Sequence, residues 1–379
     1  MAHIHITLVG GQPTPVYQGV VLSQPDKIIL ICSKETKSDA EIITNKLKEL
    51  QFYNVTTETY PIDEPQVVRQ KLEVLLSIFD FSEKDSISMN LSSGVKLWSL
   101  ICLDICPRVN SHAYCLSQNG KVLNIIGQSP KSKVEFDMFT QFVLLGNVLS
   151  SYSIFSDYCE QEKENHEILK QLYKNSTFQK LLKLLKLKVS SEAPQSKDLQ
   201  NWLKSDRFVE MENDEEKYIE WHAKEKVFSI SLGNQNNQYY EIKGEYASQM
   251  LLNTAWFEYE EAEKMAEIYG AQNVYMNCRF LSQEEKDKNE VDVIVNTGQK
   301  LLFVECKTQI FKPTDIDKFH SVVQNYGGSG SKSLFITMHQ MNAIQQDKCN
   351  DNQIATVYLY EKDNIARSTK ALANAILEF

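Results

Sequence analysis

Apolar runs rich in β-branched residues alternate with amphipathic stretches along the first 150 residues. The runs predict strands at 4–10, 27–32, 54–60, 86–92, 112–117 and 121–126. Between them, apolar residues recur at helical spacing over 39–50, 65–79 and 94–106. This alternation predicts βαβ units around a mostly parallel sheet. Ligands of such sheets bind in the loops that follow the C-terminal ends of the strands.

The middle of the chain has a different pattern. Residues 151–175 are polar and helical, residues 178–189 form an amphipathic helix, and residues 207–243 alternate apolar and charged positions as hairpin strands do. The amphipathic helix carries Lys180, Lys183, Lys186 and Lys188. They predict a solvated helix face, and contact with a nucleic-acid backbone is the alternative.

From about residue 250 the pattern predicts a second sheet. It reads as helix 250–270, strand 273–280, an acidic loop at 282–289, strands 291–295 and 301–306, helix 315–326, strand 333–338, and then a final strand and helix. This αβββαβ order predicts a mixed sheet. We therefore expect an α/β protein with a Rossmann-like parallel-sheet domain at 1–150, a helical connector with a small hairpin-containing segment at 151–245, and a second α/β domain at 246–379.

Composition narrows the class of protein. A chain of 379 residues with 42% hydrophobic and 24% charged residues is typical of a globular protein of two domains. The net charge of −10 argues against a general nucleic-acid coat, but not against an enzyme with a local acidic site. The cysteines are scattered, and we expect Cys102 and Cys106 to be buried thiols rather than zinc ligands. The sequence also has no signal-peptide or membrane-spanning pattern. These features predict a reduced, cytoplasmic protein.

Candidate chemistry is concentrated at residues 289–309. The turn at 296–299 predicts a hairpin that places Asp292 on one strand and Glu305 and Lys307 on the next. Alternate residues of a strand share a face, so Glu305 and Lys307 project together. Two carboxylates on adjacent strands can converge on Mg²⁺ or Mn²⁺, and a nearby lysine can orient water and offset phosphate charge. A solvated surface Glu-x-Lys pair is the alternative, but the apolar flanks of this segment disfavour it.

Other residues can join this site. At about 100° per residue, Glu258 shares an apolar stripe of its helix, where either the metal site or an ion pair explains a carboxylate. Glu290 shares the strand face of Asp292 and is a candidate outer ligand. Gln309 continues the face of Glu305 and Lys307 and is a candidate substrate contact.

The order of a helix glutamate, a strand aspartate and a Glu-x-Lys pair resembles the PD-(D/E)xK, or restriction-endonuclease-like, nuclease superfamily. The resemblance covers about residues 245–379 and implies catalytic roles for Glu258, Asp292, Glu305 and Lys307. It places the metal at Asp292, Glu305 and Cys306. The proline that often precedes the aspartate is replaced by Val291.

The N-terminal sheet lacks the glycine pattern of dinucleotide-binding dehydrogenases. Its first strand instead leads into VGGQPTP, its second into CSK, and its fourth into NLSSGVK and a helix. Loops of this kind offer backbone N–H groups, hydroxyls and a helix N-terminus to a phosphate. The candidate ligand-binding residues are Gly11, Gln12, Thr14, Ser33, Ser93, Gly94 and Lys96. Ordinary helix capping by Ser92 or Ser93 is the alternative.

Together the two halves resemble the CRISPR ancillary nucleases, which join a CRISPR-associated Rossmann fold (CARF) domain to a restriction-endonuclease-like domain. The motifs VGGQPTP, CSKET and NLSSGVK resemble the sensor strand ends, and WFE with VDV and VECKT resemble the nuclease motifs. Where related sensors often have Thr-Gly-Gly-Thr-Lys, this chain has Ser92-Ser-Gly-Val-Lys96, which removes one hydroxyl.

The family implies a homodimer that binds a cyclic oligoadenylate, most often cyclic tetra-adenylate, across its twofold axis. It also implies Mn²⁺ or Mg²⁺ as cofactor, single-stranded DNA and RNA as substrates, nicking of duplex DNA, and a role in type III CRISPR antiviral defence. A non-catalytic nucleotide-sensing regulator whose middle segment binds DNA is the alternative from another class. A restriction-type nuclease without second-messenger control is a third reading.

Overall fold

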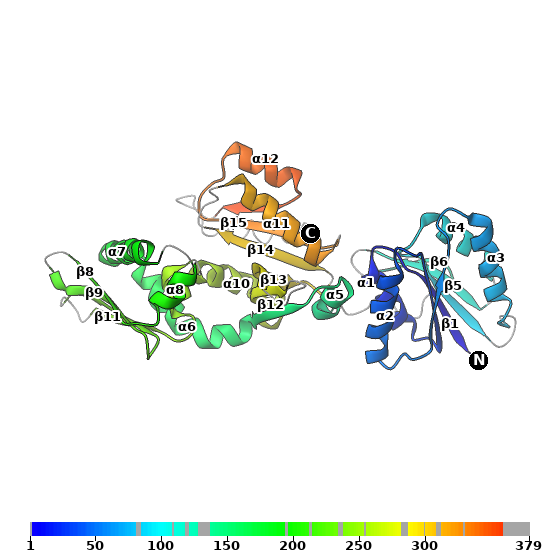
Figure 1. Ribbon diagram of the computed structural model, residues 1–379, viewed down its shortest axis with the longest axis horizontal. Helices are drawn as coiled ribbons and strands as arrows, with labels where there is room; N and C mark the ends of the chain where they lie inside the picture. Colours follow the sequence, from blue (N-terminus) through cyan, green and yellow to red (C-terminus); the bar gives the residue numbers. More distant parts are fainter. Residues whose placement is uncertain are drawn as a thin grey trace.

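The computed structural model describes residues 2–80, 85–107, 110–117, 121–127, 137–193, 196–211, 214–233, 238–253, 255–281, 287–298, 300–307, 312–328 and 330–358. The molecule is elongated, with the N-terminal sheet at one end and the middle segment at the other (Figure 1). The second large sheet lies between them. The predicted fold class, an N-terminal parallel-sheet domain followed by a separate C-terminal α/β domain, is confirmed.

The N-terminal domain is built on six strands in the order β3-β2-β1-β4-β5-β6. They are β1 (His3–Leu8), β2 (Lys27–Cys32), β3 (Val55–Thr59), β4 (Ser86–Asn90), β5 (Ser111–Leu116) and β6 (Val122–Ile126). All neighbours are parallel except β5 and β6. The strand order reverses at β1, so the loops after β1 and β4 adjoin at the C-terminal edge. Crevices at such switch points are the usual ligand sites of open α/β sheets.

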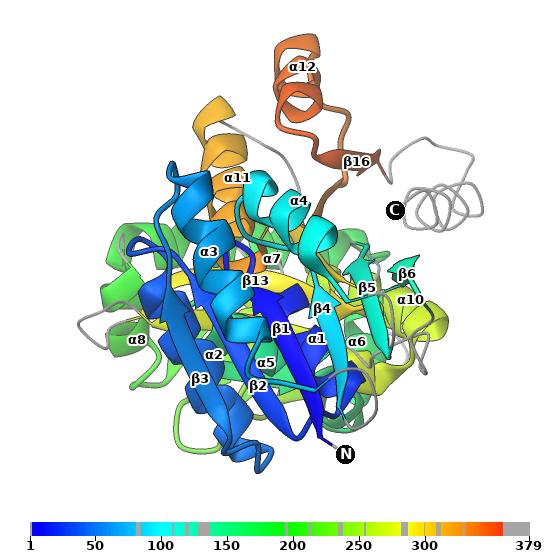
Figure 2. The same cartoon turned by 90° about the vertical axis from the view of Figure 1, so that its right-hand side faces the viewer.

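Helices cover both faces of this sheet (Figure 2). They are α1 (Pro13–Ser23), α2 (Lys37–Glu49), α3 (Pro65–Leu76) and α4 (Lys96–Ile105). Val68 and Leu72 of α3 pack with Trp98 of α4 on one face, and Val16 of α1 packs with Ile43 of α2 on the other. The helix α1 was not predicted, although it has prolines in its first turn. Proline fits the first turn of a helix, where its missing N–H would have no partner in any case.

The helix α5 (Met138–Leu144) joins the two large sheets. Asp137 caps its N-terminus by accepting hydrogen bonds from the backbone N–H groups of Phe139 and Thr140. Phe142 lies in the core of the C-terminal sheet, where its ring meets Phe280 edge to face at 5.1 Å. Leu144 lies in the core beneath α1 and α2. One short helix is therefore held by both hydrophobic cores.

The middle segment contains an antiparallel sheet in the order β11-β10-β9-β8. Its elements are α6 (Phe155–Leu172), α7 (Ser176–Glu192), α8 (Ser196–Trp202), β8 (Arg207–Met211), β9 (Asp214–His222), β10 (Val227–Leu232) and β11 (Tyr239–Lys243). The predicted hairpin strands are confirmed. On α7, Lys180, Lys183 and Lys186 are exposed, and the Lys188 ammonium donates to the Phe208 carbonyl at 3.0 Å.

The C-terminal sheet has the order β16-β15-β14-β13-β12-β7. Its elements are β7 (Leu149–Ile154), α9 (Ala247–Leu252), α10 (Ala255–Tyr269), η1 (Ala271–Asn273), β12 (Val274–Leu281), β13 (Asp287–Asn296), β14 (Leu301–Lys307), α11 (Pro313–Gly327), β15 (Lys332–Thr337), α12 (Ala343–Asp351) and β16 (Ala355–Tyr358). The pairs β7–β12, β12–β13 and β13–β14 are antiparallel, and the pairs β14–β15 and β15–β16 are parallel.

Three sequence predictions need correction here. The acidic loop expected at 282–289 overlaps β13, which begins at Asp287, because the backbone from Asp287 onward pairs with β12. The helix expected at 250–270 is interrupted, since Asn253 has an extended backbone. The helix α12 lies before the final strand β16 and was not predicted, and the final helix predicted after that strand lies outside the described residues. Asn342 and Gln345 form a capping box that starts α12 before β16. The predicted boundaries at 150 and 245 stay a proposal, although β7 already extends the C-terminal sheet.

Candidate active site and sensor edge

The predicted acidic residues meet at one end of the C-terminal sheet. Val293 of β13 pairs with Val304 of β14, which puts Asp292 and Glu305 at the next position along the two strands. The Lys307 Nζ atom lies 2.6 Å from Glu305 Oε1 and 3.9 Å from Asp292 Oδ2. The Cys306 backbone N–H donates to Asp292 Oδ2 at 2.8 Å. The two strands thus hold two carboxylates and an ammonium in one cluster.

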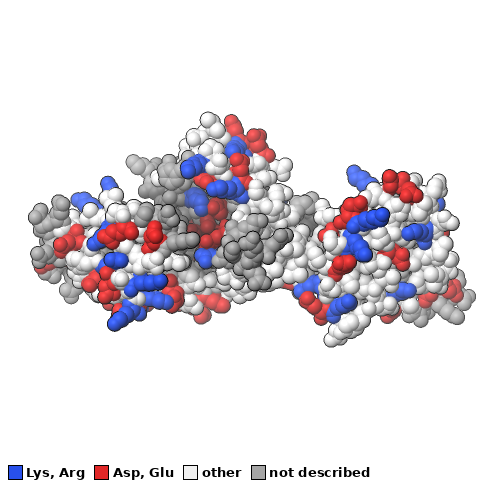
Figure 3. Space-filling view, in the orientation of Figure 1, with Lys and Arg blue, Asp and Glu red and all other residues white. Residues whose placement is uncertain are grey.

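Strand alternation fixes the direction of these side chains. Val304 and Cys306 belong to the core beneath α10, whereas Phe303 belongs to the core beneath α11. Glu305 and Lys307 continue the face of Phe303, at the C-terminal end of β14. Figure 3 shows acidic side chains recessed in a hollow there, between the part with α11 and α12 and the part with α7 and α8, with basic side chains beside them. Within the cluster, the Lys307 side chain is 38% exposed, so solvent reaches it.

Burial controls the electrostatics of the cluster. The side chains of Asp292 and Glu305 are only 14% and 16% exposed. Burial, and then the Asp292 charge, raise the pKa of Glu305 to about 8. Burial also raises the pKa of Asp292, although Lys307 and the Cys306 N–H oppose it. Burial alone would lower the pKa of Lys307, but the carboxylate charges of Asp292 and Glu305 raise it above its ordinary value. Two crowded carboxylates of this kind favour a bound cation.

The helix α10 brings two more carboxylates toward this end of the sheet. Glu258 is half-buried, and its charge helps to raise the pKa values of Lys307 and of the Cys306 thiol. Glu261 is fully buried, and its charge also raises the pKa of the Cys306 thiol. One Glu261 oxygen accepts from Lys264 Nζ at 2.6 Å, and Oε2 has no hydrogen-bond partner. Glu261 was missed from the sequence, although three residues after Glu258 it falls on the same helix face.

The residue types suit a hard divalent cation. Among the residues that the structure describes, no three His, Cys, Asp or Glu side chains are grouped to hold a metal ion. Mg²⁺ does not need such a group, because it usually keeps several waters and takes one or two carboxylates. Asp292 and Glu305 supply that pair. The Cys306 thiol lies on the opposite face, and burial raises its pKa well above the ordinary value. The metal prediction for Cys306 therefore applies to its backbone alone.

The remaining candidates for this site lie apart from it. The Glu290 side chain is 47% exposed and forms an ion pair with Arg279 at 3.4 Å. It affects the cluster only through its charge, which raises the pKa values of Asp292 and Glu305. Gln309 lies outside the described residues.

The N-terminal sheet presents its predicted ligand loops at the switch point between β1 and β4. A Cβ atom on Gly94 would lie 2.6 Å from the Leu8 Cβ atom, and Gly94 has a φ of 81°. A Cβ atom on Gly10 would lie 2.5 Å from the Gly94 backbone nitrogen. Only glycine satisfies both the close approach and the positive φ at Gly94. The two loops are thus in direct backbone contact.

Serine hydroxyls tie these loops together. Ser93 Oγ accepts from the Gly10 N–H at 3.1 Å, and Ser92 Oγ accepts from the Leu116 N–H at 2.7 Å. Neither serine caps the following helix, whose N-cap is Val95 with no side-chain cap. The alternative interpretation as helix capping is therefore wrong. Ser33 is buried, and its hydroxyl accepts from the Thr36 N–H at 3.3 Å.

The other sensor candidates stand nearer to solvent. Gly11 and Gln12 are exposed, Thr14 is half-buried in the first turn of α1, and Lys96 is exposed at the first position of α4. The structure thus brings Gly11, Gln12, Ser93 and Gly94 into adjoining loops at one edge of the sheet. Ser33 lies at the same edge, in the loop after β2, where Thr36 Oγ1 donates to the Val9 carbonyl.

Comparison with known proteins identifies both halves. Residues 4–142 match the family described as the Card1 CARF domain, and residues 245–375 match the Card1-like endonuclease domain. No curated protein sequence gave a match. Protein VC1899 from Vibrio cholerae has a similar fold, with a TM-score of 0.70 at 14% identity over 98% of each chain.

Two further solved structures share the fold. One is Can2 from Sulfobacillus thermosulfidooxidans in complex with cyclic tetra-adenylate, with a TM-score of 0.64, 16% identity, and 99% of this chain and 98% of that chain covered. The other is a type III CRISPR defence DNA nuclease activated by cyclic oligoadenylate, with a TM-score of 0.56 and 14% identity. All of this chain matches 52% of that longer one. Separately, no helix in the described ranges is long and apolar enough to cross a membrane.

Proposed function

We propose that this chain, which has the sensor and nuclease domains of a CRISPR ancillary nuclease, is a homodimeric, metal-dependent nuclease that a cyclic oligoadenylate activates. The observation that carries the proposal is the Asp292–Glu305 pair, buried and in contact with Lys307 at the open end of two strands. Such an arrangement is costly in a purely regulatory domain, because buried like charges destabilise the fold unless they bind a cation.

Each residue of the cluster has its own role in the proposed phosphodiester hydrolysis. Asp292 and Glu305 would hold Mn²⁺ or Mg²⁺, which supplies a water of lowered pKa and neutralises charge on the scissile phosphate. Lys307 is next to both carboxylates and remains protonated, so its ammonium orients the attacking water and stabilises negative charge on the phosphate. Glu258 adds negative charge from α10 and keeps Lys307 protonated.

The sensor domain supplies the activator site. The adjoining loops after β1 and β4 offer backbone N–H groups around Gly11, Gln12 and Gly94, and Lys96 adds a positive charge beside them. Thr14, Ser33 and Ser93 complete the proposed set. The Can2 neighbour was solved with cyclic tetra-adenylate, and we propose the same activator here. A twofold ligand suits a homodimer, because each subunit offers the same loops.

Single-stranded DNA and RNA are the proposed substrates, with nicking of duplex DNA, in type III CRISPR defence. One neighbour is described as a DNA nuclease of that defence system. The recessed acidic cluster suits a flexible single strand, because a single strand can bend a phosphate into a hollow between two parts of the protein.

The test is a cleavage assay with Mn²⁺ on fluorescent single-stranded DNA and RNA, with and without cyclic tetra-adenylate. We expect cleavage that requires both the metal and the activator. Binding of the activator without cleavage of any substrate would favour the nucleotide-sensing regulator. Equal cleavage with and without activator would favour a restriction-type nuclease without second-messenger control.

A further inference from the structure

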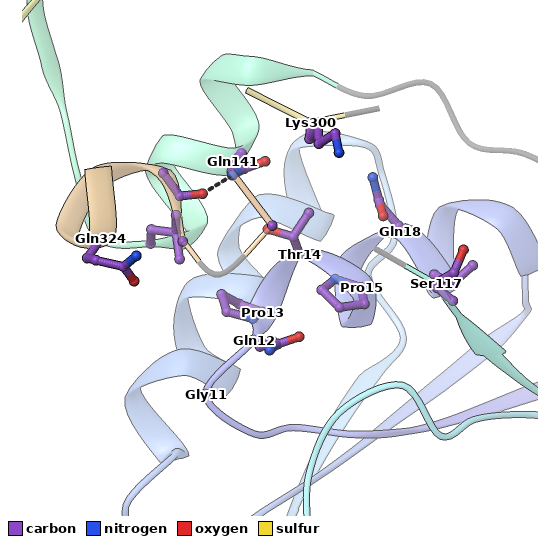
Figure 4. A pocket seen from close by; sticks show the side chains of 15 residues that line it. Gly11, Gln12, Pro13, Thr14, Pro15, Gln18, Ser117, Gln141, Lys300 and Gln324 are labelled. Carbon is purple, nitrogen blue, oxygen red and sulfur yellow. Dashed lines mark hydrogen bonds between the residues drawn. The ribbon is translucent and has the colours of Figure 1, made fainter. Parts of the chain in front are cut away.

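Most buried polar side chains in proteins have hydrogen-bond partners. Gln141 of α5 is an example, since it lines a pocket of about 320 Å³ between the sensor and nuclease domains and donates its amide to the Gly327 carbonyl at 2.6 Å (Figure 4). The hydroxyl of Thr337, at the nuclease end, is an exception. Thr337 is fully buried, and its Oγ1 atom has no partner among the described residues. A buried hydroxyl without a partner destabilises the fold, so it needs an explanation.

Thr337 lies beside the lysine of the acidic cluster. It is the last residue of β15, which runs parallel to β14, and it pairs in register with Lys307. The Met338 N–H donates to the Lys307 carbonyl at 3.3 Å and holds the two strand ends side by side. Phe335, two residues before Thr337, packs in the same core as Phe303. Since alternate residues of a strand share a face, the side chains of Thr337 and Lys307 project on the same side of the sheet.

The neighbour of Thr337 on its other side is already engaged. On β16, Tyr358 pairs in register with Thr337, and the Tyr358 hydroxyl donates to the Gln346 side chain. Lys307 is thus the neighbour in register whose polar group is able to turn toward the Thr337 hydroxyl. Because Thr337 is completely removed from solvent, it does not contact a substrate phosphate directly. A role in catalysis therefore has to pass through Lys307.

The Lys307 ammonium needs a second position in the working enzyme. It lies 2.6 Å from Glu305 Oε1, on one of the two carboxylates that would hold the divalent cation. Like charges repel, so the ammonium gives up this contact when the carboxylate pair holds a cation. The Lys307 side chain is 38% exposed and flexible, which lets it turn while the strands stay in place. A neutral acceptor suits the second position, because it stabilises the ammonium without competing for the cation.

We propose that Thr337 is a positioning residue for Lys307, and that its hydroxyl accepts a hydrogen bond from the ammonium when Asp292 and Glu305 hold the cation. This bond keeps the ammonium beside the carboxylate pair, where it orients the attacking water and stabilises negative charge on the scissile phosphate. It also gives the buried hydroxyl a partner. The inference rests on the proposed function and adds a residue from a strand outside the Glu-x-Lys motif.

The test compares three full-length variants at saturating Mn²⁺ and cyclic tetra-adenylate. Thr337→Val keeps the shape of the side chain and removes the hydroxyl, whereas Thr337→Ser keeps the hydroxyl. Thr7→Val is the matched control, because Thr7 is also a fully buried strand threonine without a partner among the described residues, but lies on β1 of the sensor sheet. We expect Thr337→Val to lower kcat on a fluorescent single-stranded DNA about tenfold with KM nearly unchanged. Thr337→Ser and Thr7→Val should keep a kcat close to that of the wild type.

Three further measurements separate positioning from a structural role. In a Lys307→Ala background, Thr337→Val should cause no further loss of rate, because the ammonium that it positions is gone. The melting temperature of Thr337→Val without metal should equal or exceed that of the wild type, since a buried hydroxyl without a partner is replaced by a methyl group. Its calorimetric affinity for Mn²⁺ should stay near the wild-type value, because Thr337 is not a ligand.

Each outcome decides for or against this role of Thr337. A wild-type kcat in Thr337→Val, or an equal loss in Thr337→Ser, would overturn the inference and leave the proposed nuclease intact. A further loss of rate when Thr337→Val is added to Lys307→Ala would do the same. A wild-type protein that cleaves no single strand with Mn²⁺ and the activator would overturn the proposed function and this inference together.

Discussion

The nuclease end and the sensor edge of this molecule are built by opposite means. At the nuclease end, charged side chains on rigid strands are crowded together and partly removed from water, which raises the pKa of Glu305 to about 8. At the sensor edge, two glycine-containing loops meet in backbone contact, and Lys96 is exposed. The first region works through desolvated charge, and the second through the shape of the backbone.

This difference predicts how each region responds to substitution. A site of desolvated charge should lose its chemistry when one side chain changes, while the strands that carry it remain folded. A site formed by close backbone approach should lose its shape when a Cβ atom is added, whatever the charge of the new residue. The predictions below test that division, beginning with the largest expected effect.

Removing either carboxylate should abolish cleavage. Asp292→Asn and Glu305→Ala should each reduce the cleavage rate on the order of 10³ or more, since a divalent cation loses a charged ligand. Both variants should keep the wild-type melting temperature or exceed it, because each removes a buried charge. The control is Glu290→Gln, which alters an exposed carboxylate paired with Arg279 and should cleave almost normally. Full activity of the wild type in EDTA would contradict the metal mechanism.

Lys307→Ala should separate metal binding from catalysis. The ammonium touches Glu305 at 2.6 Å, so its loss should leave the carboxylates free for Mn²⁺ but slow cleavage about a hundredfold or more. Isothermal titration with Mn²⁺ gives the affinity, and a single-turnover cleavage assay gives the rate. A variant that neither binds Mn²⁺ nor cleaves would assign Lys307 to assembly of the metal site instead.

A pair of glycines tests the sensor edge. Gly94→Ala forces a positive φ on alanine and puts its Cβ 2.6 Å from that of Leu8, which should cost about 3 kcal/mol of stability. Gly11→Ala is the matched control, since a Cβ atom there meets nothing within 4 Å. Calorimetric melting should therefore show a loss only for Gly94→Ala. Equal melting temperatures would mean that the two loops do not need this close approach.

The same division explains what could be predicted from the sequence. Asp292, Glu305 and Lys307 were found because a hairpin turn and strand alternation fix which residues share a face, and the structure brings Lys307 within 4 Å of both carboxylates. Glu261 was missed because the apolar stripe included only Glu258, although Glu261 lies three residues further along the same face and is fully buried. The strands of the N-terminal sheet were predicted to within two residues at most of their ends, since strand-like and helical patterns alternate regularly there.

Contacts between distant segments could not be predicted in this way. The sequence showed glycines and serines after β1 and β4, but not that Ser93 binds the Gly10 N–H while Ser33 faces its own loop. The helix α5 was not predicted either. Its residues follow no single amphipathic pattern, because Phe142 and Leu144 enter two different cores. The pocket between the domains depends on that helix and so was not foreseeable.

Histidines at the opposite end of the sensor sheet should make this domain sensitive to acid. His5 is fully buried, with Nδ1 2.7 Å from Ser88 Oγ, and burial and then the His3 and His112 charges lower its pKa to about 3. The unfolded chain takes up this proton near pH 6.5, so stability is complete above that value and is lost as pH falls toward 3. Between pH 6.5 and 5 the loss should be about 2 kcal/mol.

His5→Gln removes this titration and should flatten the decline in melting temperature between pH 6.5 and 5. The control is Gly11→Ala, which removes no titrating group and should decline with pH as the wild type does in this range. Scanning calorimetry at several pH values makes the measurement. Identical pH profiles for wild type and His5→Gln would show that His5 is not the group that titrates.

The smallest effect gives the sharpest test of the comparison. Lys96 is exposed beside the two sensor loops, so its charge should add to activator binding without defining the shape of the site. Lys96→Glu should therefore raise the activator concentration needed for half-maximal cleavage about tenfold, while the rate at saturation stays near that of the wild type. Glu305→Ala should do the reverse, with normal activator affinity and no cleavage. A titration of cyclic tetra-adenylate against both variants, read by calorimetry and by cleavage of a fluorescent single strand, makes the comparison. If Lys96→Glu also lowered the rate at saturation, or if Glu305→Ala lost the activator, sensing and chemistry would share residues, and the division into a backbone-shaped sensor and a charge-based nuclease site would fail.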